Sequence, residues 1–552
     1  MDNQRLFLFI ALSFVLLLIW QAWMKDYGPQ PAAPERAQTA AKAPSTPAAR
    51  APVPELPGPS TTATPAATAP AAATAATGRL VHVRTDVLDV QINTTGGELL
   101  RAALPRFAVS AEPPRKPVVL LDDRGDKLFV AQSGLVGDGD AAPTHHAPFT
   151  VAHYNYRLAP GENQLQVRLQ WSAPDGVHVE KVYTFHRNSY VVRLQQIVRN
   201  AGTKPWRARP YEQLLRHPPK EGSSLFLHTY VGGAIYTPAD KFRKVSFKDM
   251  SKKELDVKAV GGWVAMDQHY FLAAWIPPAK APEQFYTKAL PDDRYVIGTA
   301  GDLFEVGPGQ TRTVTARLYL GPKLQDILSG VAPGLALTID YGYLTVLAKP
   351  IFSLLRWIEG LVGNWGWAIV ILTVLIKLAF YKLSETSYRS MANMRRLAPR
   401  LKALKERYGD DRQRLNQAMM DLYKKEKINP LGGCLPILVQ IPVFIALYWV
   451  LLESMELRQA PFILWIHDLS APDPYFVLPI LNGITMLVQQ RLNPSPLDPM
   501  QQKIMMIMPL MFAVFFAFFP AGLVLYWLVN NILSISQQWV ITRRVEQGAK
   551  TA

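Results

Sequence analysis

Long apolar runs separate parts of this chain that suit a lipid bilayer from parts that suit water. A helix needs about 17 to 25 mostly apolar residues to span the hydrocarbon core. Six runs are candidates, and the fourth and fifth are shorter than a full span: 6–24, 365–382, 435–452, 476–490, 504–519 and 523–541. We therefore predict a multi-pass α-helical membrane protein with six transmembrane helices.

Between the first and second runs the pattern changes to strict alternation. Apolar Leu88, Val90 and Ile92 alternate with polar residues before a turn at Thr95-Gly96-Gly97. Residues 165–171 and 177–185 alternate on either side of Pro174-Asp175-Gly176, a favoured turn sequence. Period two is typical of half-buried strands. The pattern predicts a large all-β domain, most simply a sandwich.

Two further segments have helical periodicity. Residues 343–361 form an amphipathic stretch around Pro350, which suits a helix lying on the outer membrane surface or a helix docked on the β domain. Residues 391–408 and 415–423 repeat apolar side chains at helical spacing around a break at 409–411, which predicts a helical hairpin. Its methionine-rich stripe either zips the two helices together or receives apolar clients.

The remaining boundaries follow from composition. Residues 29–77 are mostly Ala, Pro and Thr, a composition that does not fold by itself. The predicted order is an anchor (1–27), a linker (28–78), the β domain (79–330) and an amphipathic segment (331–364). Five spans (365–383, 431–452, 475–491, 504–519, 520–541) then alternate with loops (384–430, 453–474, 492–503) before a tail (542–552). The first run lacks a small-x-small cleavage site, so we favour an anchor over a cleaved signal peptide.

Charge gives the orientation. The segment 382–430 carries 13 Lys or Arg against 6 Asp or Glu, whereas the loop 453–474 contains only one basic side chain, Arg458. Cytoplasmic loops of membrane proteins are enriched in Lys and Arg. The hairpin and both termini are therefore predicted to be cytoplasmic, with the β domain outside. The basic exterior of the hairpin suits anionic lipid or ribosomal RNA.

The β domain offers little chemistry. Cys434 is the only cysteine and lies far from this domain, which excludes internal disulfides there. His145 and His146 are adjacent, and on an extended strand their side chains would point to opposite faces, which disfavours a metal site. A sugar cleft is conceivable in a sandwich of this size, but a spacer or protein-contact role is favoured.

Polar side chains gather on particular faces of the apolar helices. The cation Lys377 lies in the second run, and ionisable residues inside a membrane mark functional sites by default. Several polar stripes are best satisfied around a shared hydrophilic cavity. The alternatives are contacts between helices and, for Lys377, snorkelling to the inner surface. The residues predicted to line the cavity are Thr373, Lys377, Gln440, Asn482, Thr485, Gln489, Tyr526, Asn530 and Ser534.

Several segments resemble the YidC membrane-protein insertase family. They are 429–436 (NPLGGCLP), 440–444 (QIPVF), 446–448 (ALY), 457–462 (LRQAPF), 464–469 (LWIHDL), 498–505 (DPMQQKIM) and 522–527 (GLVLYW). The resemblance extends over the whole chain, including the anchor, the linker and an exported β domain of the Gram-negative type.

This resemblance implies a function. Members insert other membrane proteins into the bacterial inner membrane, alone or beside the Sec translocon, and use no nucleotide, metal or other cofactor. It implies nascent membrane proteins, the Sec translocon, the ribosome and inner-membrane lipid as partners, and no DNA. It further implies five core helices around a cytoplasm-open hydrophilic groove, and a β-supersandwich whose direct role in insertion is minor.

The resemblance also assigns individual residues. The single groove cation falls at Lys377, where the family usually has arginine, and the following Tyr-Pro step is Tyr381-Lys382 here. Ile441 and Phe444 fall on the hydrophobic slide along which clients are thought to pass.

Two other functional classes share some of these features. A secondary transporter also buries ionisable residues, but such proteins usually show repeated halves and this sequence has no internal repeat. An intramembrane hydrolase needs a nucleophile with a base, and neither Gly-x-Ser-x-Gly nor His-Glu-x-x-His occurs. His467 lies beside Trp465 and Asp468, in a loop predicted to be outside the membrane. We therefore expect an insertase and no enzymatic activity.

Overall fold

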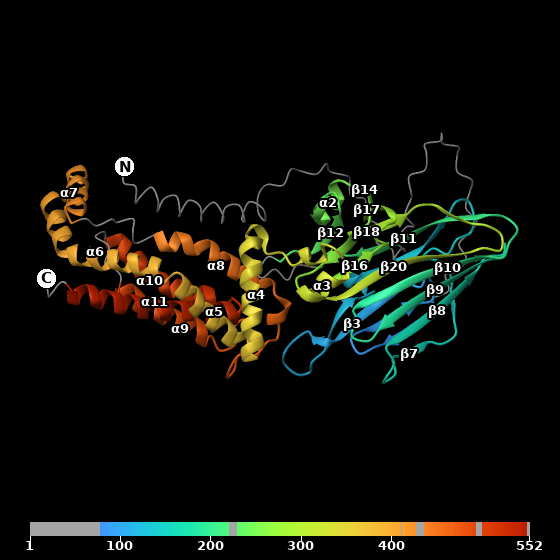
Figure 1. Cartoon of the computed structure of the whole chain (residues 1–552), viewed down its shortest axis with the longest axis horizontal. Coiled ribbons are helices and arrows are strands. Elements are labelled where there is room, and N and C mark those ends of the chain that lie inside the picture. Colours follow the sequence, from blue (N-terminus) through green and yellow to red (C-terminus); the bar gives the residue numbers. More distant parts are fainter. Residues whose placement is uncertain (1–77, 220–228, 410, 427–434, 493–498, 549–552) are drawn as a thin grey trace, which may run out of the picture. The chain divides into compact units, whose positions relative to one another are not determined.

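The computed structural model describes residues 78–219, 229–409, 411–426, 435–492 and 499–548. The predicted anchor, nearly all of the linker and Cys434 lie outside these residues. The described part contains a β domain followed by helices (Figure 1).

Two large sheets form the β domain. Within the described residues, the main path of the first sheet runs β14 (Asp256–Val260), β17 (Pro282–Leu290), β18 (Arg294–Gly301), β11 (Trp206–Arg216), β5 (Phe129–Gly137), β3 (Leu99–Ala108), β2 (Asp89–Asn93), β1 (Leu80–Arg84) and β7 (Asn155–Arg157). β4 (Pro117–Leu121) pairs with β3, and β19 (Phe304–Val306) pairs with β11. The second sheet runs β13 (Lys241–Val245), β12 (Gly232–Thr237), β15 (Trp263–Asp267), β16 (Phe271–Ile276), β20 (Thr311–Pro322), β10 (Val191–Asn200), β9 (Val177–His186), β8 (Gln164–Ser172) and β6 (Thr150–Val151).

The predicted turns are present. β8 and β9 pair antiparallel with Leu165 opposite Phe185, and Gly176 in the turn between them has a φ of 90°. Gly96 and Gly97 have φ values of 78° and 62°, a backbone region that favours glycine. The predicted hairpin and the first turn are therefore confirmed.

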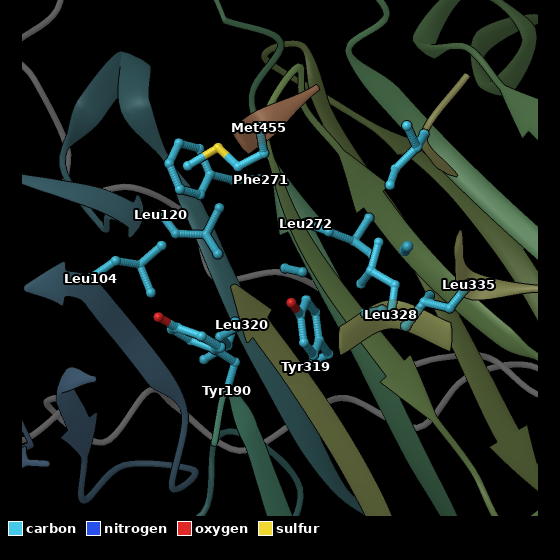
Figure 2. Close-up of a cluster of buried hydrophobic side chains, with 14 of the residues drawn as sticks. Leu104, Leu120, Tyr190, Phe271, Leu272, Tyr319, Leu320, Leu328, Leu335 and Met455 are labelled. Atoms are coloured by element: carbon cyan, nitrogen blue, oxygen red, sulfur yellow. The ribbon is translucent and has the colours of Figure 1, made fainter. Parts of the chain in front are cut away.

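Alternation places one face of strands such as β1 and β2 in the core, whereas β15 and β16 are buried on both faces. Trp206, Trp263 and Trp275 are among the largest fully buried side chains of the domain. Figure 2 shows part of this core, where Tyr319 of β20 lies near Leu328 of the segment that follows and Leu320 lies near Tyr190. Burial of apolar surface is the main source of stability for a domain without disulfides.

The helices follow the β domain. Those that concern the site are α4 (Thr345–Val362), α5 (Trp365–Ala379), α6 (Tyr381–Tyr408), α7 (Arg412–Lys425), α8 (Leu435–Glu453), α9 (Val477–Leu492), α10 (Pro499–Phe516) and α11 (Ala521–Gly548). α11 is central, because it contacts α5, α6, α8 and α9 (Figure 1). Among the described helices, no single one is both long and apolar enough to cross a bilayer. The pair α5 and α6, which is bent by 68°, is long and apolar enough only when the two helices are taken together.

The amphipathic helix α4 buries one face and exposes another. Ala348, Phe352, Leu355 and Ile358 are buried, and α4 contacts α5 and α8. Its exposed side also carries large apolar residues, including Trp357. The helix runs continuously through Pro350 and ends at Gly363, whose φ of 66° suits a glycine C-cap. Contacts with helices therefore account for its buried stripe.

The predicted hairpin of 384–430 corresponds to most of α6 together with α7. The two helices contact each other and are separated at Gly409. Leu397 and Leu401 of α6 are buried, whereas Met420 of α7 is exposed. Part of the apolar stripe of the hairpin is therefore buried, and part of it, at Met420, is exposed.

Candidate functional site

The cation predicted in the second apolar run is buried. Lys377 lies near the C-terminal end of α5 and only 5% of its surface is exposed. Its Nζ donates a hydrogen bond to Oγ of Ser534 on α11 at 2.7 Å. Within the described part of the chain, no carboxylate lies within ion-pairing distance of Nζ. A buried cation without a counterion is costly, which makes it a candidate for function.

Ser534 connects several helices around this cation. Its hydroxyl donates to the carbonyl of Asn530 one turn earlier, and the side chain of Tyr388 from α6 lies nearby. On α5, the hydroxyl of Thr373 is buried and donates to the carbonyl of Ile369 within its own helix. Thr373 therefore adds a polar lining without bonding another helix.

A second polar contact lies one turn away along α11. Nδ2 of Asn531 donates to Oδ1 of Asn482 on α9 at 2.8 Å, and both side chains are buried. Thr485 donates to the carbonyl of Asn482. We call Lys377, Ser534, Asn531 and Asn482 the polar cluster. It joins α5, α9 and α11.

Some polar atoms near the cluster lack partners. Among the described residues, Nδ2 of Asn482, Nε1 of Trp527 and Oε1 of Gln537 are buried without a hydrogen bond. An unsatisfied buried polar group costs about 1 to 3 kcal/mol. Water or a polar ligand in this region would remove that cost.

Phe444 and Ile441 on α8 differ in their surroundings. Phe444 stacks on Tyr526 with ring centroids 6.0 Å apart and meets Trp527 edge-on at 5.0 Å. Ile441 is 43% exposed, and Gln440 beside it is half-buried. α8 therefore presents an aromatic contact to α11 and an apolar side chain to its surroundings.

A hollow of about 260 Å³ lies between α6 and α11. It is lined by Glu385, Arg389, Asn393, Ile541, Arg544 and Val545. Ile541 follows Ser534 by seven residues, two helical turns along the same face of α11. Arg389 is paired with Glu385, whereas Arg544 has no ion pair within the described residues. The hollow therefore continues the α11 face that holds the polar cluster.

The structure groups only some of the predicted lining residues. Lys377, Ser534 and Asn482 belong to the polar cluster, and Thr373, Thr485 and Asn530 lie one turn or less from its members. Tyr526 instead stacks on Phe444. Gln489 is half-buried on α9, two turns beyond Asn482. Asn531, Tyr388 and Gln538, whose buried amide donates to the carbonyl of Leu492, were not predicted from the sequence. Asn531, Ser534 and Gln538 have the spacing i, i+3, i+7, so helical periodicity on α11 contained this signal.

The prediction that His145 and His146 lie on an extended strand is wrong. His145 and His146 lie in a turn, not on a strand, and their ring centroids are 4.0 Å apart. Nδ1 of His145 is within hydrogen-bonding distance of the Tyr211 hydroxyl. No cluster of three or more metal-ligating side chains occurs among the described residues.

The core of the β domain contains buried charges. Nζ of Lys181 donates to the carbonyls of Gly96 and Ser133, and burial lowers the pKa of Lys181 to about 7. Burial raises the pKa of Glu283 to about 7, although its carboxylate accepts a hydrogen bond from Thr299. These groups lie between the sheets, where they specify packing and affect stability.

Comparisons with known proteins cover the whole chain. Residues 80–354 match the family model described as the YidC periplasmic domain, and residues 357–548 match the model described as the 60Kd inner membrane protein. Curated relatives from Thioalkalivibrio sulfidiphilus and Methylococcus capsulatus are each 52% identical, with both chains covered completely. A relative from Nitrosococcus oceani is 50% identical over 99% of this chain and all of its own. All three are named membrane protein insertase YidC. With two models that span the β domain and the helices, and relatives identical at half of their positions, the chain belongs to the YidC family.

Proposed function

We propose that this protein inserts client proteins into the bacterial inner membrane. The relatives that cover its full length are named for this activity. The β domain matches a periplasmic domain and the helices match an inner membrane protein. No covalent step is needed, because moving an apolar helix from water into lipid is favourable by about 25 cal/mol per Å² of apolar surface.

The observation that carries the mechanism is the burial of Lys377 without an ion pair among the residues that the structure describes. Its amino group is held by Ser534 rather than extended towards the helix surface, which argues against snorkelling. In a poorly screened environment a cation attracts an acidic chain more strongly than in water. We infer that Lys377 attracts the acidic tail of a client while that tail crosses the bilayer.

Hydration of the polar cluster completes this mechanism. The unpartnered atoms of Asn482, Trp527 and Gln537 favour water in a groove between the helices. A water-filled groove shortens the distance that a polar tail must cross through hydrocarbon. The hollow at Arg389 and Arg544, on the same face of α11, suits its cytoplasmic mouth.

The apolar part of the client needs a separate path. Ile441 is exposed on α8, and Phe444 lies one turn away against α11. We propose that the client helix passes along this side of α8 into lipid. Short fourth and fifth spans would thin the bilayer locally and lower the cost of crossing.

The remaining parts of the proposal concern topology and partners. We propose six crossings with the predicted boundaries, both termini cytoplasmic and the β domain periplasmic. The basic α6–α7 hairpin suits anionic lipid or ribosomal RNA, and the Sec translocon is a partner for larger clients.

Insertion of an acidic-tailed, single-span client tests the role of Lys377. Cells depleted of their own insertase would express the wild type or Lys377→Arg, Lys377→Ala or Lys377→Glu at matched levels. We expect Arg to retain insertion, Ala to lose most of it and Glu to lose more, because the effect follows charge. Protease protection of the client tail is the measurement.

Lys382 supplies the matched control. It lies five residues further along and its side chain is 93% exposed. Lys382→Ala and Lys382→Glu should leave insertion unchanged. Normal insertion by all three Lys377 variants would contradict a role for charge at this position.

A further inference from the structure

A second hollow lies on the β domain, away from the helices considered so far. It has a volume of about 230 Å³ and opens on the second sheet, where β10 and β20 pair and β16 ends. Its lining includes Arg193 and Gln195 of β10, Thr315 and Arg317 of β20, and Pro277-Pro278 after β16. The proposed insertion mechanism uses none of these residues.

The two arginines are direct cross-strand neighbours. Arg193 is opposite Arg317 in the antiparallel register of β10 and β20. Like charges in this position repel each other and destabilise the pair of strands. On the other side of Arg193, the register partner is the uncharged Thr184 of β9. Two positive charges are therefore placed together without a nearby neutralising strand residue.

Some other arginines of the β domain pair with a carboxylate on a neighbouring strand. Arg168 on β8 pairs with Glu180 on β9 at 3.1 Å, and Arg207 pairs with Glu305 at 2.8 Å. Neither Arg193 nor Arg317 forms an ion pair with any residue that the structure describes. Arg193 and Arg317, which have each other as cross-strand neighbours, thus differ from Arg168, which faces a carboxylate across the strands.

Arg317 is held in position. Its Nη1 donates to the carbonyl of Val331 at 2.9 Å, at the end of α3 (Gln325–Val331). Burial, and then the charge of Arg193, lower the pKa of Arg317. A guanidinium that is half-buried, fixed at one nitrogen and faced by a second cation favours a bound anion, because the anion would offset both effects.

We propose that this hollow binds a small ligand through a carboxylate or phosphate group shared between Arg193 and Arg317. The two guanidinium groups offer donors that match two oxygens of such a group. The side chains of Gln195 and Thr315 add uncharged donors, and Pro277-Pro278 give an apolar wall for the rest of the ligand. At about 230 Å³ the hollow is smaller than a typical pocket for a drug-sized ligand, so the ligand is a small one, and a sugar acid or sugar phosphate is a suitable probe.

Calorimetric titration of the purified full-length chain in detergent tests this site. The probes are inorganic phosphate, glucose 6-phosphate, glucuronate and uncharged glucose. We expect the anions to bind and glucose not to bind. Tighter binding of glucose 6-phosphate than of glucuronate would support a phosphate ligand, and the reverse order would support a carboxylate.

Arg193 is the residue to change, because Arg317 also supports α3. Arg193→Gln should weaken anion binding about ten-fold, through loss of a charge-assisted contact, and Arg193→Lys should weaken it less. Arg199→Gln is the matched control: Arg199 lies on the same strand and face, opposite Thr311 and outside the hollow. The Arg199→Gln variant should bind the anions with the same affinity as the wild type.

Three outcomes would overturn the site. They are absence of binding by every anion, binding of glucose as tight as that of glucuronate, and equal weakening by Arg193→Gln and Arg199→Gln. Circular dichroism of each variant ensures that loss of binding does not reflect loss of the β domain. Because binding is measured without a client, the result is independent of the insertion assay.

Discussion

Glu283 on β17 makes the stability of the β domain depend on pH. Burial raises the pKa of its carboxyl group from 4.5 to about 7. As the pH rises, Glu283 therefore ionises first in the unfolded chain. The contribution of Glu283 to the free energy of unfolding is fully present below pH 4.5 and is lost as the pH rises through 7. A shift of this size corresponds to about 3 kcal/mol. Glu283→Gln, which cannot ionise, should remove most of this loss in urea unfolding followed by circular dichroism.

Glu305 is the control for that change. It carries the same side chain on β19 but is half exposed and paired with Arg207. Glu305→Gln should leave the decline between pH 4.5 and pH 7 intact. An unchanged decline in Glu283→Gln would show that other buried acids, such as Glu212, dominate the pH dependence.

Individual site residues were predictable from the sequence where the pattern of a single helix identified them. Lys377 was recognisable as the single cation in an apolar run, but its burial depends on how α11 packs against α5. Its partner Ser534 was placed in a polar stripe, but the bond between them depends on how α5 and α11 pack. Asn530 and Asn531 are adjacent, and only the position of α9 determines that Asn531 meets Asn482.

At the scale of elements, the start of α5 depends on one side chain. Oδ1 of Asn364 accepts a hydrogen bond from the amide of Trp367, while Nδ2 donates to the carbonyl of Phe462 in the loop before α9. Asn364→Ala removes both contacts and should cost about 1 to 2 kcal/mol. Hydrogen exchange should then become faster at the first turn of α5 and in the loop around Phe462.

Asn364→Asp separates the two roles. A carboxylate still accepts from Trp367 and suits a helix N-terminus, but it cannot donate to the loop. Exchange should therefore rise in the loop alone. Unchanged exchange in the Ala variant would contradict the proposed link between the loop and α5.

The presence of helices and strands was predicted better than the positions at which one element ends and the next begins. Alternation and Pro174-Asp175-Gly176 were enough for the β8–β9 hairpin, because strand period and turn chemistry are local. The second apolar run was predicted as one span to residue 383, whereas α5 ends at Ala379 and α6 begins at Tyr381 after a bend. Neither glycine nor proline marks that bend, so the local sequence contains no conventional signal for it.

For the whole molecule, the distribution of charge predicts the topology. Of a net charge of +16, the segment 382–430 accounts for +7, whereas the loop 453–474 is acidic. Since basic loops stay in the cytoplasm, the α6–α7 hairpin and the β domain should lie on opposite sides of the membrane. The β domain should then face the periplasm, in keeping with the family model that it matches.

Cysteine labelling tests this topology directly, because Cys434 is the only native cysteine. In a Cys434→Ala background, single cysteines replace exposed Asn163 in the β domain, exposed Ala403 in α6 and Thr551 in the tail. A membrane-impermeant maleimide added to intact spheroplasts should label only position 163, and lysis should expose the other two. Labelling at 551 before lysis would place the C-terminus outside, which contradicts the five crossings predicted between the β domain and the C-terminus. Labelling at 403 before lysis would place the α6–α7 hairpin outside, which contradicts the orientation predicted from charge. The two positions therefore test the span count and the orientation separately.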